Sequence, residues 1–165
     1  MKRNSSDGFT LIEIMLVVII LAILAMMTIP RLSDASDESR EKALLADVAA
    51  IQRQVSRYKF DHNNRCPHIK ADGSVDNNGD NFIARMTGKT APSGAVSVSG
   101  TCGPYFREWP ANPFISSSAA AAQITIGTGP APRDDKSGWW FDVTTQTLQP
   151  NSARGALTQF PRAGG

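Results

Sequence analysis

The longest apolar run in the chain extends from Phe9 to Ile29, and its polar members are Thr10, Glu13 and Thr28. As an α-helix, a run of this length reaches across the roughly 30 Å hydrocarbon core of a bilayer. We therefore expect residues 9–30 to form a transmembrane helix rather than a core helix of a soluble domain. Pro30 ends the run and predicts a kink or a local break in the helix.

Beyond Pro30 the chain changes from apolar on all sides to apolar on one face. Residues 31–60 contain no Gly or further Pro, which favours continued helix. Apolar residues recur there at helical spacings of 4, 3, 4 and 3, and they are Leu44, Val48, Ile51, Val55 and Tyr58. We expect an amphipathic helix over 31–60 that packs this stripe against a small domain and ends at Asp61, Asn63 and Asn64.

Four short segments after the helix favour β-strands. Their composition predicts strands at 95–99, 123–127, 138–143 and 147–148, the last two forming a hairpin. The Asp-, Asn- and Gly-rich segment 71–81 predicts a polar loop, and the tail from Asn151 is expected to be frayed. The expected fold class is α+β, with a long N-terminal helix packed on a small antiparallel β-sheet. The 165 residues leave room for one soluble domain beside the membrane segment.

A carboxylate inside the apolar run needs a partner. Glu13 would lie within the membrane, where charged side chains are costly and usually face protein or an opposite charge. Lys2 and Arg3 lie outside the run. A cut after Gly8 would create an α-amino group on Phe9, four residues before Glu13 on the same helix or beside the Glu13 of a neighbouring copy. An ordinary secretory signal is cleaved after its apolar region, which is removed. The cut after Gly8 would lie before the apolar run, so the mature chain would keep the run.

The N-terminal pattern resembles that of a known family. The short basic leader, Gly8, the sequence F-T-L-I-E, the apolar run and Pro30 are similar to the class III signal of type IV pilins and type II secretion pseudopilins. The resemblance implies that prepilin peptidase removes the leader, residues 1–8, by cutting after Gly8, and that it methylates Phe9. It also implies that Glu13 places each incoming subunit in a helical filament of identical copies.

The apolar run also allows two simpler interpretations. It could be an uncleaved signal anchor. It could also be a secretory signal cut after Ala35, because Ser33 and Ala35 are small residues at the two positions that a signal-peptide cleavage site requires. Neither explains a glutamate inside the membrane.

A second segment resembles the major, G-type pseudopilins. Their G-P-Y segment is matched by Gly103, Pro104, Tyr105, Phe106, Pro110, Pro113 and Phe114. This resemblance implies a structural subunit of a type II secretion pseudopilus, whose growth drives protein export. Its further partners would be other pseudopilins, the inner-membrane secretion platform and the lipid bilayer. Two alternatives stay open: a type IV pilin for adhesion, motility or DNA uptake, and a membrane-anchored periplasmic binding module that never polymerises.

Charge indicates the orientation of the chain. Lys2 and Arg3 precede the apolar run, so the N-terminus is expected in the cytoplasm, and residues 31–165 are expected to form a periplasmic head of a single-pass inner-membrane protein. The net charge is +2, and removing residues 1–8 leaves +1. A balance this close to neutral does not indicate a nucleic-acid partner.

The two cysteines, Cys66 and Cys102, would lie in an oxidising compartment and are expected to form a disulfide. Their bond would close a loop of 37 residues and contribute about 3–4 kcal/mol to stability. An alternative is a zinc site formed by Cys66 with His62 and His68, but a fourth ligand is not evident.

Calcium is the candidate ion at a loop near the C-terminus. In G-type pseudopilins a loop beside the final strands holds calcium, and Asp134 with Asp135 lie in the comparable region, although no Asp-x-Asp ladder is present. A weaker calcium candidate is Asp76, Asn78 and Asp80, which align with an EF-hand loop but place Asn81 where Gly is required. No other cofactor is expected.

The sequence contains no G-x-S-x-G, P-loop or H-E-x-x-H motif, so we expect no enzymatic activity. The aromatic residues near the C-terminus, Trp109, Trp139, Trp140 and Phe141, suit a core better than a carbohydrate- or peptide-binding face.

Overall fold

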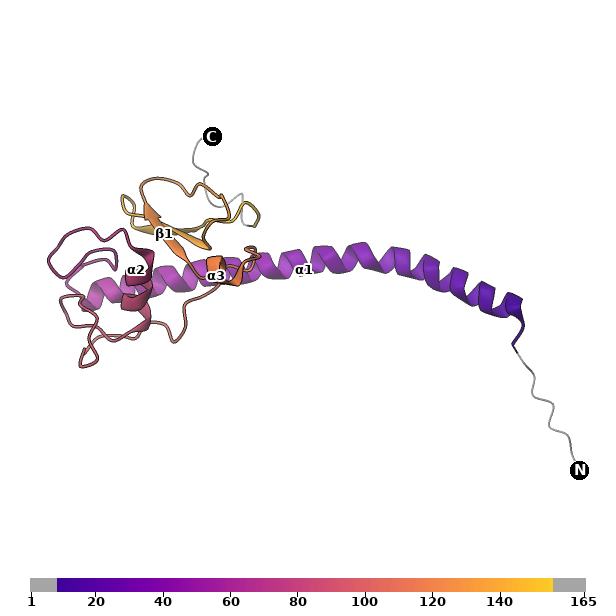
Figure 1. Cartoon of the computed structure of the whole chain (residues 1–165), viewed down its shortest axis with the longest axis horizontal. Helices are drawn as coiled ribbons and strands as arrows, with labels where there is room; N and C mark the ends of the chain where they lie inside the picture. The colour runs from indigo at the N-terminus through magenta and orange to yellow at the C-terminus, as the bar shows by residue number, and fades with distance from the viewer. Residues whose placement is uncertain (1–8, 156–165) are drawn as a thin grey trace, which may run out of the picture. The chain divides into compact units, whose positions relative to one another are not determined.

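The computed structural model describes residues 9–155, except for the side chains of residues 26–35. The predicted leader, including Gly8, and residues 156–165 lie outside the described residues. The chain divides into two compact units, which we call the N-terminal unit, Met1–Ser39, and the head, Arg40–Gly165. The secondary structure elements are the helices α1, Leu11–Asp61, α2, Gly79–Thr87, and α3, Ser118–Ala121, followed by the strands β1, Ile124–Gly127, β2, Trp139–Asp142, and β3, Thr147–Pro150 (Figure 1).

Helix α1 contains both helical segments expected from the sequence. It continues through Pro30, so the local break considered there does not occur. The helix ends at Asp61, as predicted. Asn63 and Asn64 follow with positive φ angles of 53° and 63°, a conformation that Asn tolerates better than most residues and that cannot continue the helix.

The core of the head forms on the predicted apolar stripe of α1. All five stripe residues are buried, with exposed fractions from 0% for Leu44 to 5% for Val55. They share one hydrophobic cluster with Phe82 and Met86 of α2 and with side chains from β1, β2 and β3. Burying a large apolar side chain contributes about 1.5–3 kcal/mol, so this face of α1 fixes the position of the helix within the head.

The sheet of the head is mixed rather than antiparallel as predicted. Its strand order is β1-β2-β3; β1 pairs with β2 in parallel, and β2 pairs with β3 in antiparallel orientation. Residues 128–138 carry the chain back before β2 starts, so β2 runs in the same direction as β1. The 147–148 hairpin strand was predicted correctly. Trp139 and Phe141 alternate with Trp140 and are fully buried, which supports their predicted role in the core.

Two further sequence predictions in the head were wrong. Residues 95–99 do not form a strand, because Val96 makes only an isolated bridge to Thr90, and Val98 is 95% exposed. The start of the predicted frayed tail is instead fixed, since Asn151 and Ser152 are each 1% exposed. The Asn151 backbone N–H donates to the Gly138 carbonyl at 3.1 Å, and the Asn112 amide donates to the Ser152 hydroxyl at 3.2 Å.

Helix α2 was not predicted, because its first residues were expected to belong to a polar loop. Its N-cap is Asn78, whose side-chain oxygen accepts hydrogen bonds from the backbone N–H groups of Asp80 and Asn81. Phe82 and Met86 lie one turn apart on the same face and are fully buried in the core. The segment that is rich in Asp and Asn therefore contains the start of a helix.

Candidate processing and assembly site

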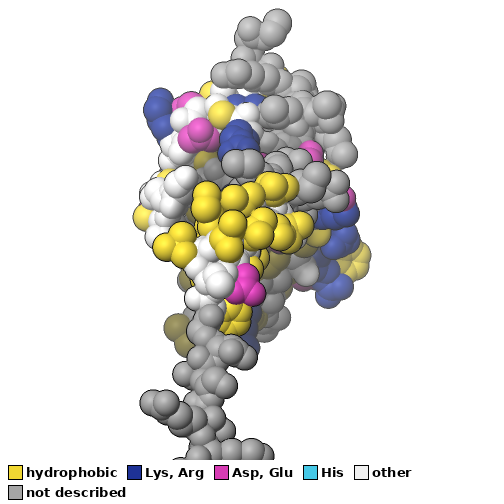
Figure 2. All heavy atoms as spheres, turned by 90° about the vertical axis from the view of Figure 1, so that its right-hand side faces the viewer, with side chains coloured by type: hydrophobic (Ala, Val, Ile, Leu, Met, Phe, Trp, Pro, Cys, Tyr) yellow, Lys and Arg dark blue, Asp and Glu magenta, His cyan; other side chains and the backbone are white. Residues whose placement is uncertain are grey.

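The described part of the N-terminal unit exposes large apolar side chains on every face of α1. Their exposed fractions range from 46% for Ile19 to 86% for Leu11, and Phe9 is 82% exposed. Figure 2 shows hydrophobic side chains gathered on the face turned toward the viewer. A helix that is apolar all round is stable only when lipid or protein surrounds it. Among the residues that the structure describes, no helical stretch is both long and apolar enough to cross a membrane.

Thr10 and Glu13 form a capping box at the start of α1. The Thr10 backbone N–H and hydroxyl each donate to Glu13 Oε2 at 3.0 Å, and the Glu13 backbone N–H donates to Thr10 Oγ1 at 3.3 Å. This reciprocal pattern satisfies donors that a helix start leaves without partners. It also fixes the start of the helix at Leu11, two residues after Phe9, with Phe9 and Thr10 outside the helix.

The capping box gives Glu13 neutral partners within its own chain. The sequence predicted a cationic partner, the α-amino group of Phe9, which exists only after cleavage. In the precursor the Phe9 nitrogen is part of a peptide bond, and the hydrogen bonds recorded for the carboxylate come from Thr10. The role of Thr10 was missed, although the spacing T-x-x-E is a recognisable capping signal.

The aromatic and Pro-rich segment from Gly103 to Phe114 joins the end of α1 to α2. The Tyr105 hydroxyl donates to Asp61 Oδ2 at 3.0 Å, and the backbone N–H groups of Tyr105 and Phe106 donate to the Met86 carbonyl at 3.0 and 2.9 Å. Trp109 is buried, and its ring meets those of Phe82 and Phe106 edge-on. The segment therefore closes one end of the head's core, as its aromatic residues suggested.

Asp134 and Asp135 are engaged by their own chain. Asp134 pairs with the Lys136 ammonium at 3.0 Å and accepts from the Asn151 amide at 2.9 Å, and Asp135 accepts from the Ala153 N–H at 2.7 Å. Calcium prefers six to eight oxygen ligands. The described residues include no group of three or more His, Cys, Asp or Glu side chains placed to hold a metal ion. This geometry does not fit calcium well, and the calcium site stays a prediction.

The other metal candidates also have structural roles. His62 hydrogen-bonds the Tyr58 carbonyl and the Thr90 hydroxyl through its two ring nitrogens, at 2.7 and 2.9 Å. Asp76, in the EF-hand-like segment, forms a buried ion pair with Arg85 at 2.7 Å. These contacts support a structural loop rather than a calcium or zinc site.

Cys66 and Cys102 are free thiols in this structure. Cys66 is buried, and burial raises the pKa of its thiol to about 12, so little reactive thiolate forms at neutral pH. Cys102 is partly exposed, and its sulfur lies 3.8 Å from the Asp61 carbonyl at the end of α1. The disulfide between the two is not formed here and stays a prediction.

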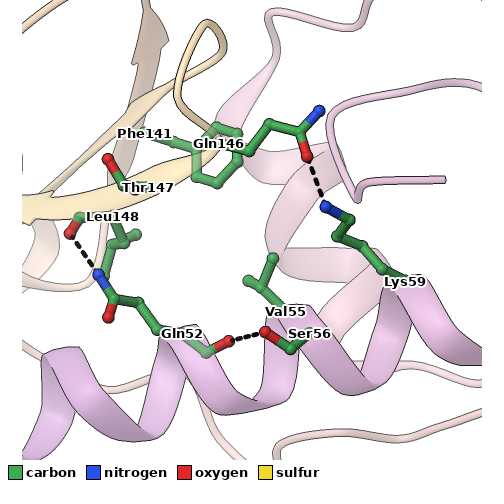
Figure 3. Close-up of a pocket in the computed structure, with 8 residues that line it drawn as sticks. All are labelled: Gln52, Val55, Ser56, Lys59, Phe141, Gln146, Thr147 and Leu148. Atoms are coloured by element: carbon green, nitrogen blue, oxygen red, sulfur yellow. Dashed lines mark hydrogen bonds between the residues drawn. The ribbon is translucent and has the colours of Figure 1, made fainter. Parts of the chain in front are cut away.

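A small cleft separates α1 from the β2–β3 hairpin in the head (Figure 3). Its volume is about 220 Å³, with Val55, Phe141 and Leu148 among its lining residues. Two polar contacts cross it: the Gln52 amide donates to the Leu148 carbonyl at 3.3 Å, and the Lys59 ammonium donates to Gln146 Oε1 at 2.7 Å. No sequence signal pointed to these contacts, which connect α1 to an edge of the sheet.

Comparison with protein families bears on the N-terminal unit. Residues 3–29 match the model of the prokaryotic N-terminal methylation motif. Comparison with curated proteins and with solved structures gave no significant match. The matched residues contain the predicted processing position, Phe9 and Glu13. The motif supports the type IV pilin-like class and indicates a precursor that prepilin peptidase processes.

Proposed function

We propose that the chain is a structural subunit of a type II secretion pseudopilus. In this proposal the precursor is held in the bacterial inner membrane by residues 9–30, with its N-terminus in the cytoplasm and its head in the periplasm. Prepilin peptidase cuts between Gly8 and Phe9 and methylates Phe9. The mature subunits then leave the membrane and polymerise, and the growing filament drives protein export. The role is mechanical rather than enzymatic.

The observation that carries this proposal is the exposed apolar start of α1 inside a matched methylation motif. Large side chains from Phe9 to Leu24 are at least 46% exposed in the single chain. Each would contribute about 1.5–3 kcal/mol when fully buried, so the segment needs an apolar environment before and after processing. Lipid supplies it to the monomer, and the helices of neighbouring subunits supply it in a filament.

Glu13 gives the assembly step its register. In the precursor its carboxylate accepts hydrogen bonds from the backbone N–H and the hydroxyl of Thr10. Cleavage creates a positive α-amino group on Phe9, and a neighbour's amine placed beside Glu13 forms an ion pair whose attraction strengthens as water is excluded. A carboxylate buried without that partner is strongly unfavourable, so only the correct axial position of the incoming subunit is tolerated.

The segment from Gly103 to Phe114 favours a pseudopilin over a pilin. It carries the G-P-Y resemblance, and in the structure it joins α1 to α2 through Tyr105 and closes the core through Trp109. Many type IV pilins place a disulfide near the C-terminus, whereas this chain has no cysteine after Cys102. Both features support the secretion role and leave the N-terminal chemistry unchanged.

The proposal is tested by expressing the full chain with prepilin peptidase and a type II secretion system that lacks its own major subunit. We expect cleavage at Gly8, short filaments in the sheared fraction when the chain is overproduced, and restored export of a secreted reporter enzyme. Long surface filaments and twitching without restored export would favour a type IV pilin. Cleaved chains that stay monomeric in the membrane would favour the binding module and contradict the proposal.

A further inference from the structure

A continuous groove runs along α1 on the side of the β2–β3 hairpin. The cleft between them shares Ser56 and Lys59 with a hollow of about 440 Å³ that Phe60 also lines. At its other end the cleft shares Gln52 and Thr147 with a hollow of about 550 Å³. Small-molecule sites in proteins typically measure about 300–1,000 Å³, so the two end hollows are large enough to hold a ligand. We call the three adjoining hollows the polar groove.

The lining of the polar groove is polar but offers little charge. Half of the residues that line it are Gln, Asn, Ser or Thr, and its charged members are Lys59 and Asp142. The Lys59 ammonium donates across the cleft to Gln146 Oε1 at 2.7 Å (Figure 3). Asp142 is 3% exposed, and its carboxylate accepts hydrogen bonds from two backbone N–H groups and from the Thr145 hydroxyl. The groove therefore suits a neutral polar ligand better than an ion.

The polar groove keeps hydrogen-bonding groups of both kinds for a ligand. The Gln52 amide nitrogen donates to the Leu148 carbonyl, which leaves Gln52 Oε1 as an acceptor. Gln146 Oε1 accepts from Lys59, which leaves the Gln146 amide nitrogen as a donor. The side-chain amide of Asn64 has no hydrogen bond within the part of the chain that the structure describes. A hydroxyl group both donates and accepts, so a ligand with several hydroxyls can satisfy all of these groups.

Phe60 supplies an exposed aromatic ring at one end of the polar groove. The residue is 80% exposed, and the Arg57 guanidinium lies over its ring at 5.7 Å from the ring centre. Arg57 also pairs with Asp61 at 3.2 Å, so its charge has a partner in its own chain. The face of an aromatic ring carries partial negative charge. It attracts the slightly positive C–H groups that cover one face of a sugar ring.

We propose that the polar groove binds a neutral oligosaccharide. Such a ligand combines the two features that the lining matches, because its hydroxyls both donate and accept and its rings have a C–H face for stacking. Gln52 and Phe60 are 8 residues apart, about 12 Å along α1, so the groove accommodates a linear chain of sugars rather than a single ring. This inference goes beyond the proposed function and is independent of it, since the whole groove lies in the head of one chain.

Titration calorimetry tests the proposal on the full chain, in a detergent that has no sugar headgroup. The neutral probes are cellohexaose, maltohexaose and the hexamer of N-acetylglucosamine, which distinguish plain glucose chains from acetamido sugars. Hexagalacturonate is the acidic counterpart.

Two variants remove groove side chains, and each has a matched control. Phe60→Ala removes the exposed ring, and Val98→Ala shortens an exposed apolar side chain outside the groove. Asn64→Gly removes the amide and tolerates the positive φ of 63°, and Asn63→Gly makes the same change at the preceding residue, which has a φ of 53° and does not line the groove. Protease resistance of the head shows that each variant is folded.

We expect at least one neutral probe to bind with a Kd of about 1 mM or below. Phe60→Ala and Asn64→Gly should each weaken this binding about fivefold or more, while both controls stay within about twofold of wild type. Raising the salt from about 50 to 500 mM should leave the affinity nearly unchanged, because a neutral ligand is not screened.

Three results would overturn the proposal. The first is that none of the neutral probes binds. The second is wild-type affinity in both Phe60→Ala and Asn64→Gly, which would place the sugar elsewhere on the chain. The third is binding of hexagalacturonate alone that high salt abolishes, which would make the groove an anion site. None of these results depends on whether the chain forms filaments, so they leave the test of the proposed function separate.

Discussion

The carboxylate of Glu13 accepts two hydrogen bonds from a single residue, Thr10, through its backbone N–H and its hydroxyl, both at 3.0 Å. The contact lies at the N-terminal end of α1, adjacent to the position where the methylation motif predicts cleavage. Thr10 thus stabilises Glu13 in the precursor, before the Phe9 amine exists. Cleavage between Gly8 and Phe9 leaves both Thr10 donors in place, and in the proposed filament the same carboxylate also faces a neighbour's Phe9 amine.

Replacing Glu13 should separate processing from assembly. Glu13→Ala removes the carboxylate that the proposal pairs with a neighbour's amine, while Gly8 and Phe9 are unchanged. We expect normal cleavage, measured by N-terminal mass, and loss of filaments from the sheared fraction. Thr10→Val is the matched control, because it removes the hydroxyl, which donates to Glu13 and accepts from the Glu13 N–H, but keeps the Glu13 carboxylate and the Thr10 backbone N–H. Filaments at wild-type level from Glu13→Ala would show that Glu13 does not set the register.

The buried pair Asp76–Arg85 should make a large contribution to the stability of the head. Asp76→Asn leaves the Arg85 charge buried without a counter-charge, and breaking a buried pair in this way costs about 3–5 kcal/mol. Urea unfolding of detergent-solubilised full chain measures the loss. Asp72→Asn changes an exposed acid nearby and should leave the unfolding midpoint unchanged. Equal midpoints for both variants would show that the pair is not structural.

Asp76 also predicts loss of stability in acid. Burial acts to raise the pKa of Asp76, but hydrogen bonds from Arg85, Asn78 and Asn81 outweigh it and hold the pKa below the ordinary value of 3.8. The contribution of Asp76 to stability is therefore full above that ordinary value and is lost as the pH falls through the lower, folded pKa. In Asp76→Asn, the decrease of stability between about pH 5 and pH 2 should be shallower than in wild type. An unchanged slope would assign the acid sensitivity to other groups.

His68 should add a second pH dependence at a higher range. It is 4% exposed, its Nδ1 has no hydrogen-bond partner among the described residues, and its ring centre lies 5.2 Å from that of Phe141. Burial, with the positive charges of Arg85 and Lys59, lowers the pKa of His68 below 6.5. Its contribution is full above 6.5 and is lost as the pH falls, because the unfolded chain binds the proton first.

The measurement for His68 is the slope of unfolding free energy against pH between about 7 and 5. His68→Leu removes the titrating group and keeps apolar contact with Phe141, so we expect this slope to flatten whatever the change in absolute stability. A slope equal to that of wild type would show that the buried imidazole is not responsible.

The predicted disulfide is tested on protein exported to the periplasm. If Cys66 and Cys102 pair there, the intact mass is lower by two hydrogens and neither residue is alkylated after unfolding without reductant. Cys66→Ser and Cys102→Ser should then destabilise the head equally, by about 3–4 kcal/mol. Alkylation of both thiols in exported protein would show that they remain free, as they are in the structure.

Long helical patterns were predictable from the sequence, and short or long-range features were not. The stripe from Leu44 to Tyr58 spans about four turns, so its period identified both the helix and its buried face. Helix α2 offers only Phe82 and Met86 as buried apolar residues, too few to show a period beside so many turn-forming residues. The parallel pairing of β1 with β2 depends on the path of residues 128–138, which local composition does not specify.

In the candidate site, too, the residues of a local motif were predictable, and the contacts that depend on the fold were not. Phe9 and Glu13 were identified from a local motif, because cleavage and assembly chemistry are concentrated in a few adjacent residues. Thr10 was present in the same motif, but its contact with Glu13 required the geometry of the helix start. The ion pair joins Asp76 on a loop to Arg85 on a helix that was not predicted, so no local sequence pattern could predict it.

Processing of the precursor is tested most directly by the intact mass and N-terminal peptide of the full chain, recovered from membranes of cells that contain prepilin peptidase. We expect a chain that begins at Phe9 and carries one added methyl group. A chain that still begins at Met1 would contradict this in favour of an uncleaved anchor, and one that begins at Ser36 would contradict it in favour of a soluble exported domain.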